Sequence, residues 1–168
     1  MPARASGATV IGTSRTAEKL DRCREFGLDH GIVTTGSDFA EKVSAATDGK
    51  GADVILDLVG GAYFEQNLRS LALKGRMILV GLTSGREANF NLSLALQKRA
   101  QIIGTVLRGR STEEKAEATA KFAADVLPLL ASGAVKPNID RVFNANDVVE
   151  AYKYLASNES FGKVVLEF

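Results

Sequence analysis

Hydroxyl and basic side chains follow the first apolar run of this chain. Residues 9–12 read TVIG, and Ser14 and Arg15 come just after them, with Lys19 one helical turn further on. Hydroxyl groups, a planar guanidinium and an ammonium can together surround a phosphate. Cations at the start of a helix oppose its dipole, which favours a binding role over a structural one. The alternative is that Arg15 and Lys19 are ordinary solvated charges.

Glycines end two further apolar runs. Residues 54–58 are followed by Val59 and Gly60, and residues 77–80 are followed by Gly81. In open α/β sheets, ligands lie just beyond the carboxyl ends of the strands. A glycine there lets a planar ring or a phosphate approach the backbone. The same glycines would also suit tight turns between strand and helix, and residue types alone do not separate the two interpretations.

The elements that position these residues alternate between strand and helix. Short apolar runs rich in β-branched residues indicate buried strands. Between two of them, residues 62–74 carry Phe64, Leu68 and Leu71 at helical spacing. This alternation predicts an α/β fold with a doubly wound parallel sheet of the Rossmann type. The strands expected in that one sheet are residues 9–12, 31–34, 54–58, 77–80 and 102–106.

The usual opening of a dinucleotide-binding sheet is a strand, the pattern G-x-G-x-x-G and a helix. Gly7 and Gly12 do not form that pattern, so we expect a sheet that lacks its first βα unit. Residues 9–12 then take the place of the second strand, whose end carries an acid in NAD enzymes and an arginine in NADP enzymes. Residues 12–15 read GTSR and hold no acid, which predicts NADP(H) as the cofactor.

The last third of the chain has its own signals. Ser111 and Glu114 have the spacing of a capping box at the start of the longest helix. Pro128 should kink that helix or lie at its boundary. Residues 135–143 are expected to be extended, and residues 163–168 to form a final strand.

Composition excludes several classes of protein. The net charge is +1 with both signs interspersed, which argues against a nucleic-acid platform or a polybasic membrane surface. No apolar run approaches the roughly 20 residues that span a bilayer. One cysteine, Cys23, rules out an internal disulfide framework and suits a cytoplasmic protein. One cysteine and one histidine, His30, cannot build a Cys/His zinc site, so no metal is expected.

Longer segments carry a family resemblance. GTSRTAEKL, ADVILDLVGGAYFEQNLRSLALKGRMILVGL, IIGTVLRGR, VLPLLASG and SNESFGKVVLEF occur in this order over nearly all 168 residues. Together they resemble the zinc-independent quinone oxidoreductases of the medium-chain dehydrogenase/reductase superfamily, and most closely the p53-inducible quinone oxidoreductase-like branch. The resemblance covers about the C-terminal half of a family enzyme. It implies that residues 1–110 are an incomplete dinucleotide-binding domain and that residues 111–168 would complete a GroES-like catalytic domain.

The resemblance implies NADPH-dependent reduction of quinones or other α,β-unsaturated carbonyls by hydride transfer. Ser14 and Lys19 match positions that hold the 2′-phosphate, whereas Thr34 stands where many relatives carry a tyrosine near the adenosine. Asn158 matches a polar contact in the C-terminal segment. The full set of predicted cofactor-binding residues is Ser14, Arg15, Lys19, Thr34, Val59, Gly60, Gly81, Leu82, Leu107, Arg108 and Asn158. The catalytic residues and most of the substrate pocket belong to the half that the resemblance does not cover, so we expect this chain alone to be inactive.

Two other functions are compatible with these residues. One is a catalytically inactive nucleotide-binding or dimerisation module, and the other is an acyl-CoA-linked enoyl reductase of the same superfamily. In this superfamily the last strand of the sheet commonly pairs across a dimer axis, and residues 101–107 match that strand. The resemblance therefore implies a homodimer that acts on a small-molecule quinone or enone. A start of the natural protein at Met1 would favour the module, and an upstream coding segment would favour the enzyme.

Overall fold

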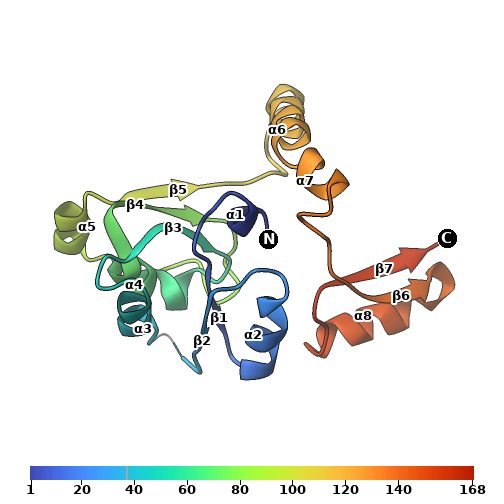
Figure 1. Ribbon diagram of the computed structural model, residues 1–168, viewed down its shortest axis with the longest axis horizontal. Coiled ribbons are helices and arrows are strands. Elements are labelled where there is room, and N and C mark those ends of the chain that lie inside the picture. Colours follow the sequence, from blue (N-terminus) through green and yellow to red (C-terminus); the bar gives the residue numbers. More distant parts are fainter. Residues whose placement is uncertain (37) are drawn as a thin grey trace.

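The computed structural model describes residues 1–36 and 38–168, in which the strands form three separate parallel groups (Figure 1). The first group is β1 (Ile11–Ser14) with β2 (His30–Val33). The second is β3 (Ala52–Asp57), β4 (Leu71–Leu79) and β5 (Gln101–Gly104) in that order. The third is β6 (Ile139–Asn144) with β7 (Lys163–Glu167). The helices are α1 (Pro2–Ala5), α2 (Ala17–Arg24), α3 (Ala40–Ala46), α4 (Gly61–Ser70), α5 (Leu92–Lys98), α6 (Thr112–Asp125), α7 (Leu127–Ala131) and α8 (Val148–Ala156), with the 3-10 turn η1 (Ala145–Asp147) before α8.

The predicted alternation of parallel strands and helices is confirmed, but the prediction of one continuous sheet is wrong. Within the described residues, β1 bonds only to β2 and β3 bonds only to β4. The reason is that no strand of this part of the chain lies between β1 and β3 to carry the hydrogen bonds across. The two groups are instead joined by packing, because Ile11 of β1 and Ala52 of β3 both contact a core formed by Ile32, Phe39 and Val43.

The second group has one covered face and one open face. Leu68 of α4 packs on Leu71 and Met77 of β4, and all three side chains are fully buried. On the opposite face of the strands, Leu56 and Ile103 are exposed. Strands of parallel sheets are normally apolar on both faces because helices cover both. Here α4 and α5 cover one face. The apolar side chains of the other face are not covered by any element of the described residues.

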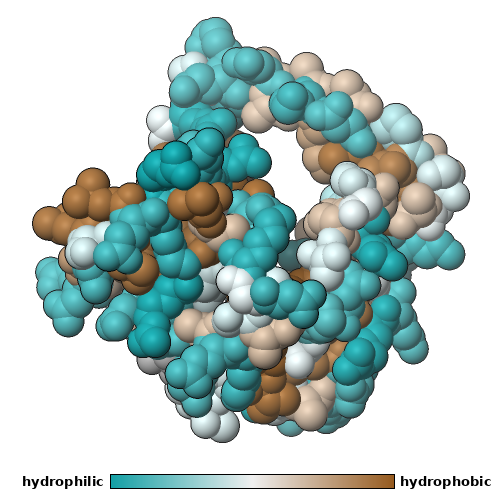
Figure 2. All heavy atoms as spheres, turned by 60° about the vertical axis from the view of Figure 1, so that its left-hand side comes forward, coloured by the Kyte–Doolittle hydropathy of each residue, from teal (hydrophilic) through white to brown (hydrophobic). Residues whose placement is uncertain are grey.

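The segment that leads to the third group also leaves apolar side chains uncovered. The long helix predicted after Ser111 is divided at Val126 into α6 and α7, and Pro128 lies in the first turn of α7, as its missing N–H requires. Neither helix has a buried residue. In the space-filling view the chain surrounds an open hole, with hydrophobic residues on part of its rim (Figure 2).

Several boundaries differ from those expected, and β1 (Ile11–Ser14) lies two residues later than the predicted residues 9–12. The helix predicted over residues 62–74 ends at Ser70, because Leu71 pairs with Ala52 and begins β4. The last strand of the second group ends at Gly104 and does not reach residue 106. Periodicity does not separate the end of a buried helix from the start of a buried strand, since both are apolar.

The capping box predicted at the start of α6 is present. The Glu114 N–H donates to Ser111 Oγ at 3.2 Å, and the Ser111 N–H donates to Glu114 Oε2 at 2.9 Å. We expect Ser111→Ala to destabilise the first turn by about 1 kcal/mol. Amide hydrogen exchange over residues 112–116 should therefore become faster, while Thr112→Ala should change it much less. Equal exchange in Ser111→Ala and the unchanged protein would contradict this role.

Candidate functional site

The predicted phosphate-binding residues lie where β1 leads into α2. Thr16 is the extended residue before the helix, and its N–H donates to Ser14 Oγ at 3.3 Å. Arg15 is exposed, and Lys19 is half-buried in the first turn. The Lys19 ammonium donates to the carbonyl oxygen of Asn158 at 2.5 Å. The structure thus brings Lys19 and Asn158 into contact although 139 positions separate them, and Ser14 and Arg15 precede Lys19 at the same strand-to-helix connection.

Contacts that the sequence did not reveal hold the C-terminal segment against α2. Arg22 lies 3.7 Å from Asp140 Oδ1, and its guanidinium lies 4.1 Å from the centre of the Phe161 ring. The Phe26 and Phe161 rings are 6.0 Å apart. A cation over an aromatic face is attracted by the ring quadrupole. No local signal in the sequence marks these residues, because each one's partner lies far away in the chain. Their residue types are also common at positions without such contacts.

Asp140 is also held from the side of α8. Tyr154 donates a hydrogen bond to Asp140 Oδ2 at 2.7 Å, and Arg141 lies 4.0 Å from the centre of the Tyr154 ring. The hydrogen bond from Tyr154 lowers the pKa of the Asp140 carboxyl, and the same bond raises the pKa of Tyr154. Asp140 therefore stays charged opposite Arg22 at neutral pH.

The loops that follow β3 and β4 form one cross-linked unit. The carbonyl oxygen of Asp57 accepts the N–H groups of Val80 at 2.8 Å and Gly81 at 3.1 Å. The Ser84 backbone N–H and hydroxyl both donate to the Val59 carbonyl oxygen, at 2.8 and 2.9 Å. The structure therefore places the predicted residues Val59, Gly60, Gly81 and Leu82 in adjoining loops.

The glycines of these loops have a structural reason of their own. A Cβ on Gly81 would lie 2.6 Å from the Leu58 carbonyl oxygen. Gly60 has a φ of +82°, and a Cβ there would lie 2.9 Å from the Gly85 carbonyl oxygen. Close packing of the two loops thus requires both glycines whatever else they contact. Their role toward a cofactor stays a prediction.

The first turn of α4 is not open to an anion. The Gly61 N–H donates to the Gly85 carbonyl oxygen at 3.1 Å, and the Ala62 N–H donates to Ser84 Oγ at 2.9 Å. Free N–H groups at a helix start are what binds phosphate. The loop after β4 occupies these two N–H groups, so they are not available to an anion.

The remaining predicted residues lie apart from this loop pair. Leu107 and Arg108 are exposed in the segment after β5, where the Arg108 carbonyl oxygen accepts from Lys115 at 3.3 Å. Thr34 is buried, with its hydroxyl oxygen 2.6 Å from the Gly36 carbonyl oxygen and 2.8 Å from Asp38 Oδ1. The Thr34 hydroxyl lowers the pKa of Asp38. Thr34 thus organises its own turn, and its contact with an adenosine stays a prediction.

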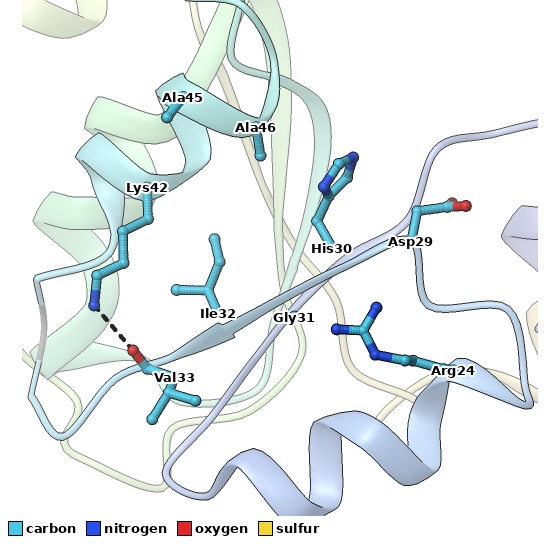
Figure 3. Close-up of a pocket in the computed structure, with 9 residues that line it drawn as sticks. All are labelled: Arg24, Asp29, His30, Gly31, Ile32, Val33, Lys42, Ala45 and Ala46. Carbon is cyan, nitrogen blue, oxygen red and sulfur yellow. Dashed lines mark hydrogen bonds between the residues drawn. The ribbon is translucent and has the colours of Figure 1, made fainter.

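An open hollow of about 670 Å³ lies along the outer edge of β2, away from the predicted residues (Figure 3). Its lining is Arg24, Asp29, His30, Gly31, Ile32, Val33, Lys42, Ala45 and Ala46. Lys42 donates to the Val33 carbonyl oxygen at 3.0 Å and so occupies part of the strand edge. None of the predicted cofactor-binding residues lines this hollow.

Within residues 1–36 and 38–168, no three His, Cys, Asp or Glu side chains come together in a way that could hold a metal ion. None of the helices in the same part is both long and apolar enough to cross a bilayer.

Residues 1–125 match the family model described as zinc-binding dehydrogenase. The chain belongs to this zinc-binding dehydrogenase family. It is 34% identical to a quinone oxidoreductase-like protein 2 homolog of Nematostella vectensis over 95% of the chain and 44% of that relative. It is 30% identical to an acryloyl-coenzyme A reductase of Sulfurisphaera tokodaii over 98% of the chain and 45% of that relative.

The fold of this dehydrogenase-family chain is found in solved structures. The Escherichia coli quinone oxidoreductase, solved in complex with NADPH, superposes with a TM-score of 0.77 and 30% sequence identity. That match covers 98% of this chain and 51% of the E. coli chain. The chain thus spans about half the length of the relatives that it matches. The predicted Rossmann-type fold and family resemblance are confirmed.

Proposed function

We propose that this chain is the cofactor-binding part of an NADPH-dependent oxidoreductase that reduces quinones or other α,β-unsaturated carbonyls. The observation that carries the proposal is the contact of Lys19, which follows Ser14 and Arg15 at the start of α2, with the C-terminal segment at Asn158. Hydroxyl and cationic groups suit the 2′-phosphate of NADPH, and the end of β1 offers no acid for a ribose 2′-hydroxyl. When bound, NADPH would supply the hydride that reduces the substrate.

The relatives support this class of chemistry. One is named as a quinone oxidoreductase-like protein, one as an acryloyl-coenzyme A reductase, and the E. coli enzyme was solved with NADPH. Quinones and acryloyl thioesters both carry a carbon–carbon double bond conjugated to a carbonyl group. An acyl-CoA-linked enoyl reductase is therefore the second candidate. The similarity to the acryloyl-coenzyme A reductase supports it.

The chain's own residues would bind and orient the cofactor. Lys19 and Arg15 would hold the phosphate, and the loops after β3 and β4 would lie around the nicotinamide. We further propose a cytoplasmic homodimer that pairs through β5 and acts on a small molecule, with no nucleic-acid partner. Because this chain spans about half of its relatives, we propose that it is inactive by itself. A nucleotide-binding or dimerisation module is the alternative if no catalytic half accompanies it.

The test is Lys19→Ala in the protein that carries this chain, with dissociation constants measured by nucleotide fluorescence. A charge-assisted contact to phosphate contributes on the order of 1.5–3 kcal/mol. The dissociation constant of NADPH should therefore rise about 10- to 100-fold, and that of NADH should hardly change. The effect should shrink at high salt, because Lys19 is only half-buried.

Lys121→Ala is the matched control, since Lys121 is an exposed lysine of α6 paired with Asp125. It should leave both dissociation constants unchanged. If Lys19→Ala weakens NADH and NADPH equally, Lys19 only fastens the C-terminal segment through Asn158, and the assignment of NADP(H) loses its main support.

A further inference from the structure

The carboxyl group of Asp57 is buried beneath the two cross-linked loops. Asp57 is the last residue of β3 and is 2% exposed. Its Oδ1 accepts the N–H groups of Val59 at 2.8 Å and Gly60 at 3.0 Å. Its Oδ2 is buried and has no hydrogen-bond partner among the described residues. The side chain therefore holds the loop after β3 with one oxygen and leaves the other unused.

The charge of this carboxylate is not neutralised by a side chain. No lysine, arginine or histidine of residues 1–36 and 38–168 forms an ion pair with Asp57. The start of α4, at Gly61, and the two N–H donors are the positive groups beside it. Burying a charge is costly unless it is compensated. Asparagine could accept the same two hydrogen bonds through its amide oxygen without burying a charge, so the bonds to Oδ1 do not by themselves require an acid.

The position of Asp57 connects its charge to the proposed cofactor. Its carbonyl oxygen holds Val80 and Gly81, so both loops proposed to surround the nicotinamide are fixed to this one residue. The nicotinamide ring is cationic in NADP⁺ and neutral in NADPH. A fixed negative charge in a region of low dielectric constant stabilises the cationic form more than the neutral form.

We propose that Asp57 positions the two loops through Oδ1 and that its negative charge favours NADP⁺ over NADPH. The inference rests on the proposed function of this site. In the proposed reaction, a bound NADPH would supply a hydride and leave as NADP⁺, and the substrate would also take up a proton. A charge that stabilises NADP⁺ on the protein makes this hydride donation more favourable. Asp57 is thus a positioning residue that also sets the relative affinity for the two forms of the cofactor.

The experiment compares the dissociation constants of NADP⁺ and NADPH in the unchanged protein and in Asp57→Asn. Asparagine keeps an oxygen acceptor for Val59 and Gly60 and removes the charge, and its amide nitrogen takes the place of the unpartnered Oδ2. An interaction between two unit charges that is weakened by an effective dielectric constant of about 20 or more changes such a ratio by roughly four- to fifteenfold. The ratio of the NADP⁺ constant to the NADPH constant should therefore rise by this factor.

Asp53→Asn is the matched control, because Asp53 belongs to the same strand but is exposed and paired with Lys50 at 3.0 Å. It should leave the ratio unchanged. Asp57→Ser, which also keeps an acceptor without a charge, provides a second variant if the amide disturbs folding. An equal loss of affinity for both nucleotides, or an unchanged ratio in a folded uncharged variant, would overturn the role of the charge. Failure of the unchanged protein to bind either nucleotide would instead refute the proposed function.

Discussion

Replacing Leu68 with alanine is expected to lower the free energy of unfolding by about 2–5 kcal/mol. Leu68 lies on α4 with no exposed surface and packs against Leu71 and Met77 of β4. Truncation removes its transfer free energy and leaves a cavity that the surrounding strands fill only in part. Because this cluster is where α4 and α5 contact the sheet, the loss should affect the whole second strand group. Urea unfolding followed by circular dichroism measures it.

Leu96→Ala provides the control for this substitution. Leu96 lies on α5 and is 77% exposed, so the same chemical change there should alter stability by less than about 0.5 kcal/mol. Similar losses in the two variants would mean that Leu68 is not a core residue in solution, and that the packing of α4 on β4 is incorrect.

Gly81→Ala is expected to destabilise the protein by about 1–3 kcal/mol and to disrupt the paired loops. The new Cβ would lie 2.6 Å from the Leu58 carbonyl oxygen, which belongs to the backbone and cannot rotate away. One of the two loops must therefore move, and the hydrogen bond from the Gly81 N–H to Asp57 would be strained. Urea unfolding gives the stability, and hydrogen exchange at residues 80–85 reports the loops.

The matched control is Gly104→Ala. Gly104 ends β5, and apart from its neighbours in the chain no heavy atom of residues 1–36 and 38–168 lies within 4 Å of the Cβ that alanine would add. Alanine there should be neutral or slightly stabilising, because it restricts the unfolded chain more than glycine does. If Gly81→Ala were as well tolerated as Gly104→Ala, the close contact between the two loops would not exist in solution.

Much of the architecture could be predicted from local sequence signals. Apolar β-branched runs located β1, β2, β3 and β5 to within two residues and the end of β4 to within one, although β4 begins six residues earlier than predicted. The spacing of Ser111 and Glu114 located the start of α6. The order of residue types also indicated that Ser14, Arg15 and Lys19 follow one another across a strand-to-helix connection: Ser14 ends β1, Arg15 lies in the connection and Lys19 lies in the first turn of α2. These signals work because strand burial, helix capping and turn chemistry depend on residues that are neighbours in the chain.

Tertiary structure alone decided which distant segments meet. The contact of Lys19 with Asn158, the pairing of Arg22 with Asp140, and the division of the expected sheet between β1 and β3 have no local signature. The burial of Asp57 is of the same kind, since an acid after an apolar run usually ends a strand at the surface. Burial and pairing of polar groups depend on what packs over them, and that comes from segments far away in sequence.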